Sequence, residues 1–529
     1  MHNRLRGSPS TMPFNRRTFL AGGAAAGGLV LLPRLGRALA PATASTRVRI
    51  YPDRAIGVVK PEFHGQFAEH LGTCIYGGLW VGRGSRIPNV DGYRAAAIQY
   101  LAELGIPVLR WPGGCYADDY HWRSGVGAER PRTVNIWWGG GVDENSFGTH
   151  EFIGLCRKIG AQPYLAGNVG SGSPEELRDW MEYCNYPSGA HGSTLADERA
   201  RNGSPEPFDV RYWGIGNESW GCGGDMRPEE YATLYRRFAN YLHPFGGVRP
   251  TLIASGPNGN DARWTRGLMD GLGRTRPGGI SMHFYEGGDA PPTQFTLDQV
   301  KKQLAIFPRV EEGIQQQRAI LDGYYAGKRV GLVLDEWGVW DRPPQAVEKR
   351  YGLLWQQDTQ RGAAAAGLGL NMFNRQADKL MMCNIAQMVN VLQSLLLTDG
   401  PDGDRCIRTP TYYVFQMFKP HRGQTAVQVE ASDSGPLGLS ASASRNGQDF
   451  LLTLVNPSPD TALEVDCDFG GAAVAARARI LHDPDWNACN TFDQPNRLVP
   501  RPHPVATTAG RLRLSVPGLA VIAVEARLS

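Results

Sequence analysis

The strongest constraint on the fold is a pattern that the chain repeats along most of its length. A short apolar run ends in a loop rich in Gly, Asn, His or Glu, and a segment compatible with a helix follows. Strands that alternate with helices in this way pair in parallel, so eight of them predict an α/β fold, a closed (β/α)8 TIM barrel. The eight runs cover residues 63–69, 106–114, 161–170, 210–218, 251–259, 279–286, 329–337 and 379–387.

The pattern changes near residue 420. Beyond it, short segments such as TAVQVEAS (425–432) and DFLLTLVNPS (449–458) alternate apolar and polar residues and are broken by Gly, Pro, Asn and Asp. Such segments predict a C-terminal antiparallel β-sandwich domain. We expect the isolated strand-like segment near the start, residues 47–61, to join this sandwich and cover one of its edges. The barrel would then span 62–420 and the sandwich 421–529.

The N-terminus has the order of an export signal. Arg16-Arg17 precedes an Ala/Gly-rich apolar run, and Ala38-Leu39-Ala40 supplies a cleavage site of the A-x-A type. We therefore expect residues 1–40 to be a twin-arginine signal peptide and the protein to be periplasmic or extracellular. The apolar run, 21–32, is shorter than the ~20 residues of a spanning helix, so we expect no stable membrane insertion after the signal is removed.

Charge and motif content exclude several classes of protein. The 55 basic and 51 acidic residues are scattered and leave a net charge of +4, which argues against nucleic acid as a partner. No H-E-x-x-H motif and no Rossmann glycine spacing occur, so we expect neither a metal nor an organic cofactor. Of the nine cysteines, Cys74, Cys115 and Cys222 each follow a strand-like run. A zinc site, one disulfide or buried free thiols are the alternatives.

Two carboxylates stand where apolar runs end, Glu218 after the fourth run and Glu336 after the seventh. In a (β/α)8 barrel these strand ends meet at one face, where active sites are built. A carboxylate pair in one cleft is the equipment of glycoside hydrolysis, with one acid and one nucleophile or base. A single Glu in such a place is commonly a helix cap or part of a surface ion pair. The hypothesis rests on the many polar residues that fall at the same strand ends: Glu69-His70, Arg110 to Cys115, Asn168, Asn217, Asn258, His283, Tyr285 and Asn384 to Gln387.

Tryptophans near these loops offer flat apolar faces on which sugar rings can stack. They are Trp80, Trp111, Trp220, Trp337 and Trp340.

Six motifs, in this order, resemble glycoside hydrolase family 51, the α-L-arabinofuranosidases. They are FAEHLGTCIYGGLW (67–80), VLRWPGG (108–114), YWGIGNESWGCGG (212–224), MHFY (282–285), LDEWGVW (334–340) and NIAQMVNVL (384–392). The resemblance implies a retaining double displacement that releases terminal α-L-arabinofuranosyl units from hemicellulose or its fragments. It also implies a homo-oligomer, since members of the family are often hexamers.

Residue roles follow from the resemblance position by position. Glu218 matches the acid/base and Glu336 the nucleophile, while Arg110 matches the arginine that holds the nucleophile. The sugar-binding and supporting positions are Glu69, Asn217, His283, Tyr285 and Gln387, with Trp340 as an aromatic wall.

The sequence departs from the family at Cys115, where the common motif has an asparagine that contacts the sugar. A thiol is a poor hydrogen-bond partner, so this substrate-binding position is weakened or reassigned. The alternatives are an endo-acting glucanase or xylanase, a furanosidase of another sugar specificity, a binding protein without catalysis, and a thiol- or zinc-dependent activity through Cys115.

Overall fold

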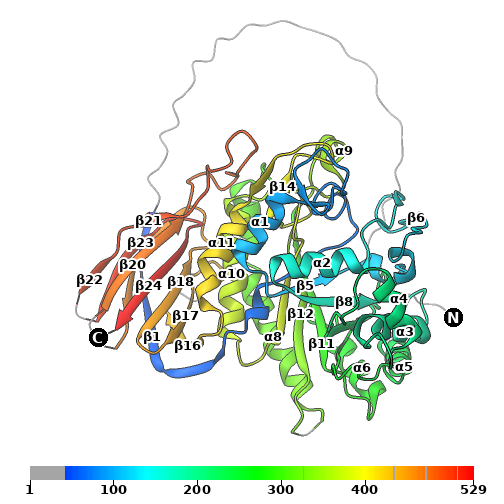
Figure 1. The fold of residues 1–529 in the computed structure, drawn as a ribbon. Helices are drawn as coiled ribbons and strands as arrows, with labels where there is room; N and C mark the ends of the chain where they lie inside the picture. Colours follow the sequence, from blue (N-terminus) through cyan, green and yellow to red (C-terminus); the bar gives the residue numbers. More distant parts are fainter. Residues whose placement is uncertain (1–41, 326, 433–434, 471–473, 509, 529) are drawn as a thin grey trace, which may run out of the picture. The chain divides into compact units, whose positions relative to one another are not determined.

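The computed structural model describes residues 42–325, 327–432, 435–470, 474–508 and 510–528. The signal peptide that we expect at residues 1–40 lies outside these ranges. Within them the chain forms a closed barrel of parallel strands and a large, mainly antiparallel sheet (Figure 1).

The eight predicted runs form the eight strands of the barrel. Around the barrel the order is β10-β11-β12-β13-β2-β5-β8-β9, and every neighbouring pair is parallel. The predicted (β/α)8 fold is therefore confirmed. The strands are β2 (Gly65–Phe67), β5 (Val108–Trp111), β8 (Gln162–Gly167), β9 (Tyr212–Ile215), β10 (Thr251–Ala254), β11 (Gly279–Gly287), β12 (Gly331–Trp340) and β13 (Met382–Ala386).

Several α-helices begin where the sequence carries cap signals, and α3 is an example. Ser173 precedes α3, and its side-chain oxygen accepts a hydrogen bond from the Glu176 backbone N–H at 3.1 Å, while Pro174 occupies the first turn. The helices are α1 (Ala95–Leu104), α2 (Thr149–Ile159), α3 (Pro174–Asn185), α4 (Thr194–Arg201), α5 (Pro228–Ala239), α6 (Ala262–Leu272), α7 (Leu297–Leu304), α8 (Phe307–Asp322), α9 (Gln345–Tyr351), α10 (Gln360–Arg375) and α11 (Pro410–Phe418). Shorter 3-10 turns are η1 (Pro61–His64), η2 (Cys115–Asp118), η3 (Trp122–Gly125) and η4 (Lys419–His421).

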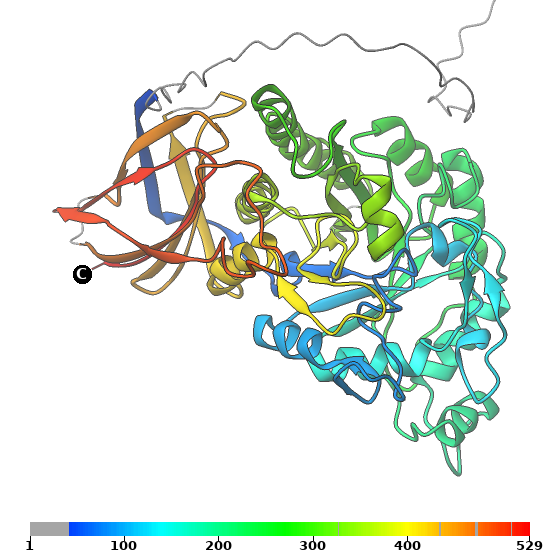
Figure 2. The same ribbon diagram turned by 90° about the horizontal axis from the view of Figure 1, so that it is seen from above.

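Nine C-terminal strands and β1 build a ten-stranded sheet in the order β21-β20-β24-β18-β17-β16-β1-β19-β23-β22. The first strand, β1, runs antiparallel to β16 and parallel to β19 (Figure 2). The expectation that it covers an edge is therefore wrong, because β1 is an interior strand with a partner on each side. At 17 residues it is also longer than the run in the sequence suggested. The strands are β1 (Ala42–Val58), β16 (Thr425–Ala431), β17 (Ser440–Asn446), β18 (Asp449–Val455), β19 (Thr461–Asp468), β20 (Val474–Leu481), β21 (Arg501–His503), β22 (Ala506–Thr508), β23 (Arg511–Val516) and β24 (Val521–Leu528).

Helix α10 packs against both sheets, and glycines at its contact points make this close approach possible. It packs against β12 of the barrel and against β17 and β18 of the C-terminal sheet. A Cβ atom at Gly369 would lie 2.5 Å from the ring of Trp337, and one at Gly367 would lie 2.8 Å from Val455. Only a helix without side chains at these points can approach both neighbours so closely.

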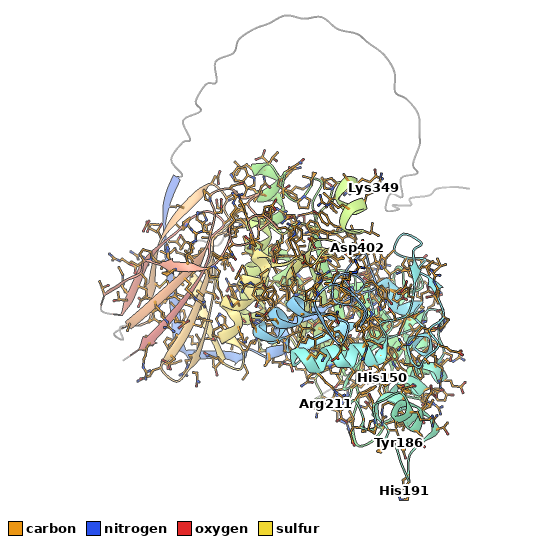
Figure 3. The ribbon with its side chains drawn as sticks, turned by 45° about the horizontal axis from the view of Figure 1, so that its top comes forward. His150, Tyr186, His191, Arg211, Lys349 and Asp402 are labelled. Carbon is orange, nitrogen blue, oxygen red and sulfur yellow. A yellow bond between two sulfur atoms is a disulfide. The ribbon has the colours of Figure 1, made fainter. Side chains whose placement is uncertain are left out.

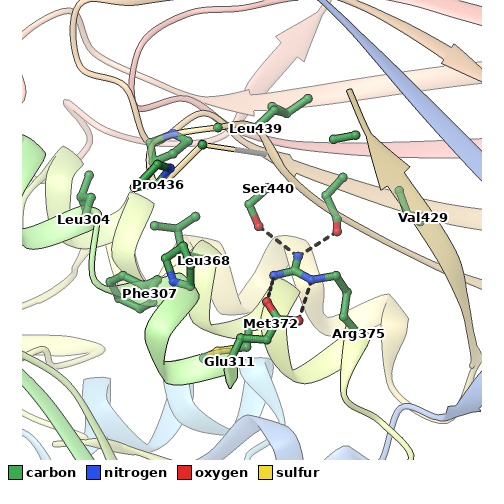
Figure 4. Close-up of a pocket in the computed structure, with 16 residues that line it drawn as sticks. Leu304, Phe307, Glu311, Leu368, Met372, Arg375, Val429, Pro436, Leu439 and Ser440 are labelled. Atoms are coloured by element: carbon green, nitrogen blue, oxygen red, sulfur yellow. Dashed lines mark hydrogen bonds and ion pairs between the residues drawn. The ribbon is translucent and has the colours of Figure 1, made fainter. Parts of the chain in front are cut away.

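A cavity of about 260 Å³ remains beside α10, between α8 and the C-terminal sheet (Figure 4). Arg375 crosses it and donates hydrogen bonds to Glu311 at 2.6 Å and to the Ser440 hydroxyl at 3.1 Å.

Three small two-stranded sheets decorate the barrel. They are β3 (Asn89–Val90) with β4 (Tyr93–Arg94), β6 (Thr133–Val134) with β7 (Val142–Asp143), and β14 (Leu396–Thr398) with β15 (Cys406–Arg408). The loop between α3 and α4 projects from the barrel, with the exposed His191 at its tip (Figure 3). None of the helices in the described ranges has both the length and the apolar character of a bilayer-spanning segment.

Candidate active site

Glu218 lies just beyond the end of β9, in a turn that the backbone needs glycine to make. Gly216 has φ of 82°, and a Cβ there would lie 2.5 Å from Val169. Buried Asp118 holds the turn, because its Oδ2 accepts a hydrogen bond from the Asn217 backbone N–H at 2.8 Å. Glu218 itself has φ of 41°, a left-handed backbone conformation that residues other than glycine rarely adopt. The turn therefore fixes the Glu218 side chain in one direction.

Asp118 was not among the residues that the sequence singled out. Its Oδ1 accepts two further backbone hydrogen bonds, from Val169 at 2.8 Å and Gly170 at 3.0 Å. Burial raises the pKa of Asp118 to about 7, although the three backbone donors oppose this shift. One carboxyl group thus ties the loop after β8 to the loop after β9.

Glu336 lies within β12 and is held by two donors. The Arg110 guanidinium donates through Nη1 to Oε1 at 2.6 Å, and the Tyr285 hydroxyl donates to Oε2 at 2.7 Å. Burial raises the pKa of Glu336, but the positive charges of His283 and Arg110 and the two hydrogen bonds outweigh it and bring the pKa below its usual value. Glu336 is therefore ionised at neutral pH.

Arg110 connects the two carboxylate regions. Its Nη2 donates to the Asn217 side-chain oxygen at 2.6 Å, and its Nε lies 3.5 Å from Oδ2 of Asp335. Asp335 was also missed, although it directly precedes Glu336 in the sequence. Asp335 in turn accepts hydrogen bonds from Tyr164 at 2.7 Å and from Asn384 at 2.8 Å.

His283 stands between the two candidate catalytic carboxylates. Its Nδ1 lies 2.9 Å from Oε1 of Glu218 and 3.7 Å from Oε2 of Glu336. Burial lowers the pKa of His283, but the two carboxylates outweigh burial and raise it above its usual value. An oxygen of each carboxylate and a His283 nitrogen all lie within 4.8 Å of one another.

Glu69 forms a separate polar corner with three donors. Its Oε1 accepts hydrogen bonds from the Trp138 indole N–H at 2.9 Å and the Tyr116 backbone N–H at 3.1 Å, and its Oε2 accepts one from the Gln387 amide at 3.1 Å. Burial, together with the negative charge of Glu336, raises the pKa of Glu69 to about 8. Glu69 is accordingly protonated over most of the neutral range, and it can donate as well as accept.

The two candidate catalytic carboxylates line one pocket of about 270 Å³, together with Glu69, His283 and Tyr285. A volume of this size suits one sugar unit better than a long segment of polymer. The pocket is lined by Glu69, Leu71, Gly114, Cys115, Trp138, Glu218, Trp220, Asn258, His283, Tyr285, Glu336, Trp340, Gln387 and Leu392.

Several of the polar and aromatic residues that the sequence places at strand ends do not line this pocket. His70 is buried against Asp143 at 2.6 Å, and Asn168 caps its own loop through Ser171 and Gly172. Trp80, Trp111 and Trp337 were expected to offer faces to sugars, but they are core residues, with 8%, 0% and 1% of their surface exposed. Only Trp220 and Trp340 of the five expected tryptophans line the pocket, and Trp138, from the loop between β6 and β7, joins them.

Cys115, which lines the pocket, forms a disulfide with Cys222, and their Cα atoms lie 5.5 Å apart. Of the three alternatives that the sequence left open, one disulfide is therefore the one observed. Cys74, the third member of the group, is buried and free. The Cys222 sulfur lies 3.6 Å from Oε2 of Glu218, so the bridge packs directly against this carboxylate.

A (β/α)8 barrel that gathers two carboxylates, their positioning partners and aromatic walls in one pocket at its strand ends defines the class of glycoside hydrolases. Comparison with known proteins supports this class. Residues 100–296 match the family model of the α-L-arabinofuranosidase 1 domain, and residues 335–520 match that of the α-L-arabinofuranosidase C-terminal domain.

The chain belongs to glycoside hydrolase family 51, the α-L-arabinofuranosidases. It is 41% identical over 500 residues to the intracellular exo-α-L-arabinofuranosidase of Bacteroides ovatus, covering 91% of this chain and 95% of the relative. The GH51 arabinofuranosidase structure from Xanthomonas axonopodis pv. citri superimposes with a TM-score of 0.86 at 36% identity, covering 92% of this chain and 100% of that one. The α-L-arabinofuranosidase of Thermotoga maritima in complex with arabinose gives 0.77 at 28% identity, covering 91% and 99%.

The prediction of export is wrong by the same comparison. The Bacteroides ovatus relative, which matches 91% of this chain, is named an intracellular enzyme. The twin arginines and the apolar run that motivated the prediction fall in residues 1–40, outside the described ranges. A basic pair before a short apolar stretch is a compositional pattern, and it does not by itself establish transport.

Proposed function

We propose that the chain is a retaining exo-α-L-arabinofuranosidase in which Glu336 is the nucleophile and Glu218 the acid/base. The observation that carries this proposal is the approach of the two carboxylates, whose oxygens lie within 4.8 Å of each other around His283. Retaining glycosidases separate their two carboxyl groups by ~5–5.5 Å, whereas inverting enzymes need ~6.5–9.5 Å to admit a water molecule.

Glu336 has the surroundings of a nucleophile. Arg110 and Tyr285 keep it ionised, and both donate to it at 2.6 to 2.7 Å, which aims the carboxylate. In the first step a carboxylate oxygen forms a bond to the anomeric carbon as the bond to the leaving oxygen breaks. The product is a glycosyl ester on Glu336.

Glu218 is suited to proton transfer at the opening of the pocket. Its side chain is 19% exposed, against 6% for Glu336, so it is the carboxyl group nearer to solvent and to a departing aglycone. It gives its proton to the leaving oxygen in the first step and takes a proton from water in the second. His283, hydrogen-bonded to Oε1, orients it.

The far end of the pocket supports action on terminal units. Glu69, Gln387 and the Trp138 indole present hydrogen-bonding groups that a sugar hydroxyl can use, and Trp340 packs edge-on against Tyr285 at 5.3 Å between ring centres. A pocket of about 270 Å³ accepts a single furanose unit and leaves the rest of the polysaccharide outside. Arg110 and Asn217 are not among its lining residues, so we assign them to positioning the carboxylates.

The test is hydrolysis of p-nitrophenyl α-L-arabinofuranoside beside its xyloside, glucoside and galactofuranoside counterparts, with proton NMR of the first sugar released. We expect arabinofuranoside cleavage with retention of the anomeric configuration. Azide should rescue Glu218→Ala with a retained glycosyl azide and Glu336→Ala with an inverted one. The exposed Glu312→Ala is the matched control and should behave as wild type. An inverted product from the wild type would refute the mechanism.

We also propose domain limits of 47–61, 62–420 and 421–529 and assembly into a homo-oligomer. The limits are supported by β1, which lies in the C-terminal sheet, and by η4, which ends at His421. Light scattering on the purified protein gives the number of chains, and a monomer at all concentrations would rule out the oligomer.

A further inference from the structure

Three metal-ligating side chains meet in the pocket wall, and the proposed hydrolysis uses only one of them. Cys115 lies at the start of η2, and Glu218 and Cys222 lie in the loop after β9. Their sulfur and carboxylate oxygen atoms all lie within 4.8 Å of one another. All three are partly exposed, so an ion can reach them from solvent.

The distances suit a soft divalent ion once the sulfurs are free. Zn²⁺ binds thiolate sulfur at ~2.3 Å and carboxylate oxygen at ~2.0–2.2 Å, so its tetrahedral ligands are roughly 3.5–3.8 Å apart. The Cys222 sulfur and Oε2 of Glu218 are already 3.6 Å apart. A reduced pair of sulfurs separates to about the same distance with little movement of the backbone.

We propose that reduction of the Cys115–Cys222 disulfide turns this wall into a Zn²⁺ site made of both thiolates and Glu218, with water as the fourth ligand. A dithiol reductant transfers two electrons and two protons to the bridge and becomes a cyclic disulfide itself. The ion then displaces the two thiol protons. With its carboxylate bound to the metal, Glu218 has no proton to deliver, so the metal-loaded enzyme is inactive. This loss of activity rests on the proposed role of Glu218, whereas binding of the ion does not.

The other cysteines do not compete for the ion. Among the described free cysteines, Cys74, Cys156, Cys184, Cys383, Cys467 and Cys489 are buried and Cys406 is half-buried. Burial raises the pKa of Cys74 to about 12, which disfavours the thiolate that a metal requires. Cys406 is the most accessible of them and serves as the matched control.

The experiment uses the full-length protein with and without a trialkylphosphine, which takes its oxygen from water and leaves two thiols per bridge. Titration of accessible thiols first counts the two that reduction should add, and a bridge that stays closed in the folded protein overturns the proposal. Zn²⁺ binding is then measured by competition with a chromophoric chelator. We expect one ion per reduced chain, none per oxidised chain, and roughly tenfold or greater weakening in Cys222→Ser but not in Cys406→Ser.

Hydrolysis of the aryl arabinofuranoside is followed in the same samples. We expect Zn²⁺ to lower the rate of the reduced enzyme at least about tenfold and a chelator to restore it. Equal Zn²⁺ affinity in the oxidised protein would place the ion at His283 between Glu218 and Glu336 and would overturn the proposal. If the reduced enzyme binds Zn²⁺ tightly, Cys222→Ser abolishes this binding and the Zn²⁺-loaded enzyme is still active, then the metal site is supported and Glu218 is not the acid.

Discussion

Replacing Tyr285 by Phe tests how the protein keeps its nucleophile ionised. The change removes one hydroxyl, which donates to Oε2 of Glu336 at 2.7 Å, and leaves the ring in place against Trp340. A hydrogen bond to a charged group contributes ~1.5–3 kcal/mol, and 1.36 kcal/mol corresponds to one pKa unit. The pKa of Glu336 should therefore rise by about 1 to 2 units.

The sign of the pH effect follows from the state that the bond favours. The pKa of Glu336 is lowered in the folded protein, so its ionised form stabilises the fold above the unfolded pKa, and this contribution is lost as pH falls through the folded pKa. Tyr285→Phe should move the acidic limb of kcat/KM upward by about 1 to 2 pH units. It should also lower the free energy of unfolding at neutral pH, with a smaller difference in acid.

The assay is the pH profile of kcat/KM for wild type, Tyr285→Phe and Tyr324→Phe. Tyr324 makes a comparable hydroxyl-to-carboxylate bond, 2.9 Å to Asp270, away from the pocket. It should leave the profile unchanged. An acidic limb that does not move in Tyr285→Phe would show that this hydroxyl does not control the ionisation of Glu336.

Three further substitutions test other parts of the structure. Glu69→Gln imitates the protonated acid, so kcat/KM near pH 6 should stay within about tenfold of wild type. Any loss of activity as pH rises through the Glu69 pKa of about 8 should disappear in this variant, and a basic limb that stays the same in the pH profile would contradict the prediction. Asp118→Asn puts an amide N–H where a carboxylate oxygen now accepts the Asn217 N–H. The free energy of unfolding, measured with denaturant, should fall by about 1–3 kcal/mol, and kcat should fall as well. Wild-type values for both would show that the turn does not orient Glu218. Gly369→Ala places a Cβ 2.5 Å from the ring of Trp337, so the free energy of unfolding in the same assay should fall by about 1–3 kcal/mol. An unchanged unfolding midpoint would mean that α10 shifts to make room for the methyl group.

The barrel could be predicted because each of its strands is marked by a pattern of neighbouring residues in the sequence. Each strand is a short apolar run followed by a polar loop. The parallel topology of the barrel then brings Glu218 and Glu336 to one face, although they are 118 positions apart in the sequence. The neighbours of those two carboxylates carry no comparable signal. Trp138 contacts Glu69 across 69 positions, and Asp118 contacts the Asn217 backbone across 99.

The sequence left one disulfide as only one of several alternatives for the cysteines, and it misplaced three of the five tryptophans, for a related reason. Cys115 and Cys222 follow different strands, and only the closed barrel brings their Cα atoms to 5.5 Å. Trp111 and Trp337 occupy strands in which successive side chains point alternately toward and away from the barrel interior, so a shift of one position decides between pocket and core. A sequence pattern locates a strand to within a few residues, which is too coarse for that choice.

The position of β1 sets an order of events during synthesis. Of the described strands, β1 leaves the ribosome first, yet its sheet partners β16 and β19 are made more than 350 residues later. At ~5–20 residues per second, it waits for roughly tens of seconds with unpaired backbone groups. Arg47, Arg49 and Arg54 lie exposed along it, and positive charges on an unpaired strand discourage pairing with other chains. The same arginines that are solvent-exposed in the finished sheet therefore protect the nascent chain until β16 and β19 have been made.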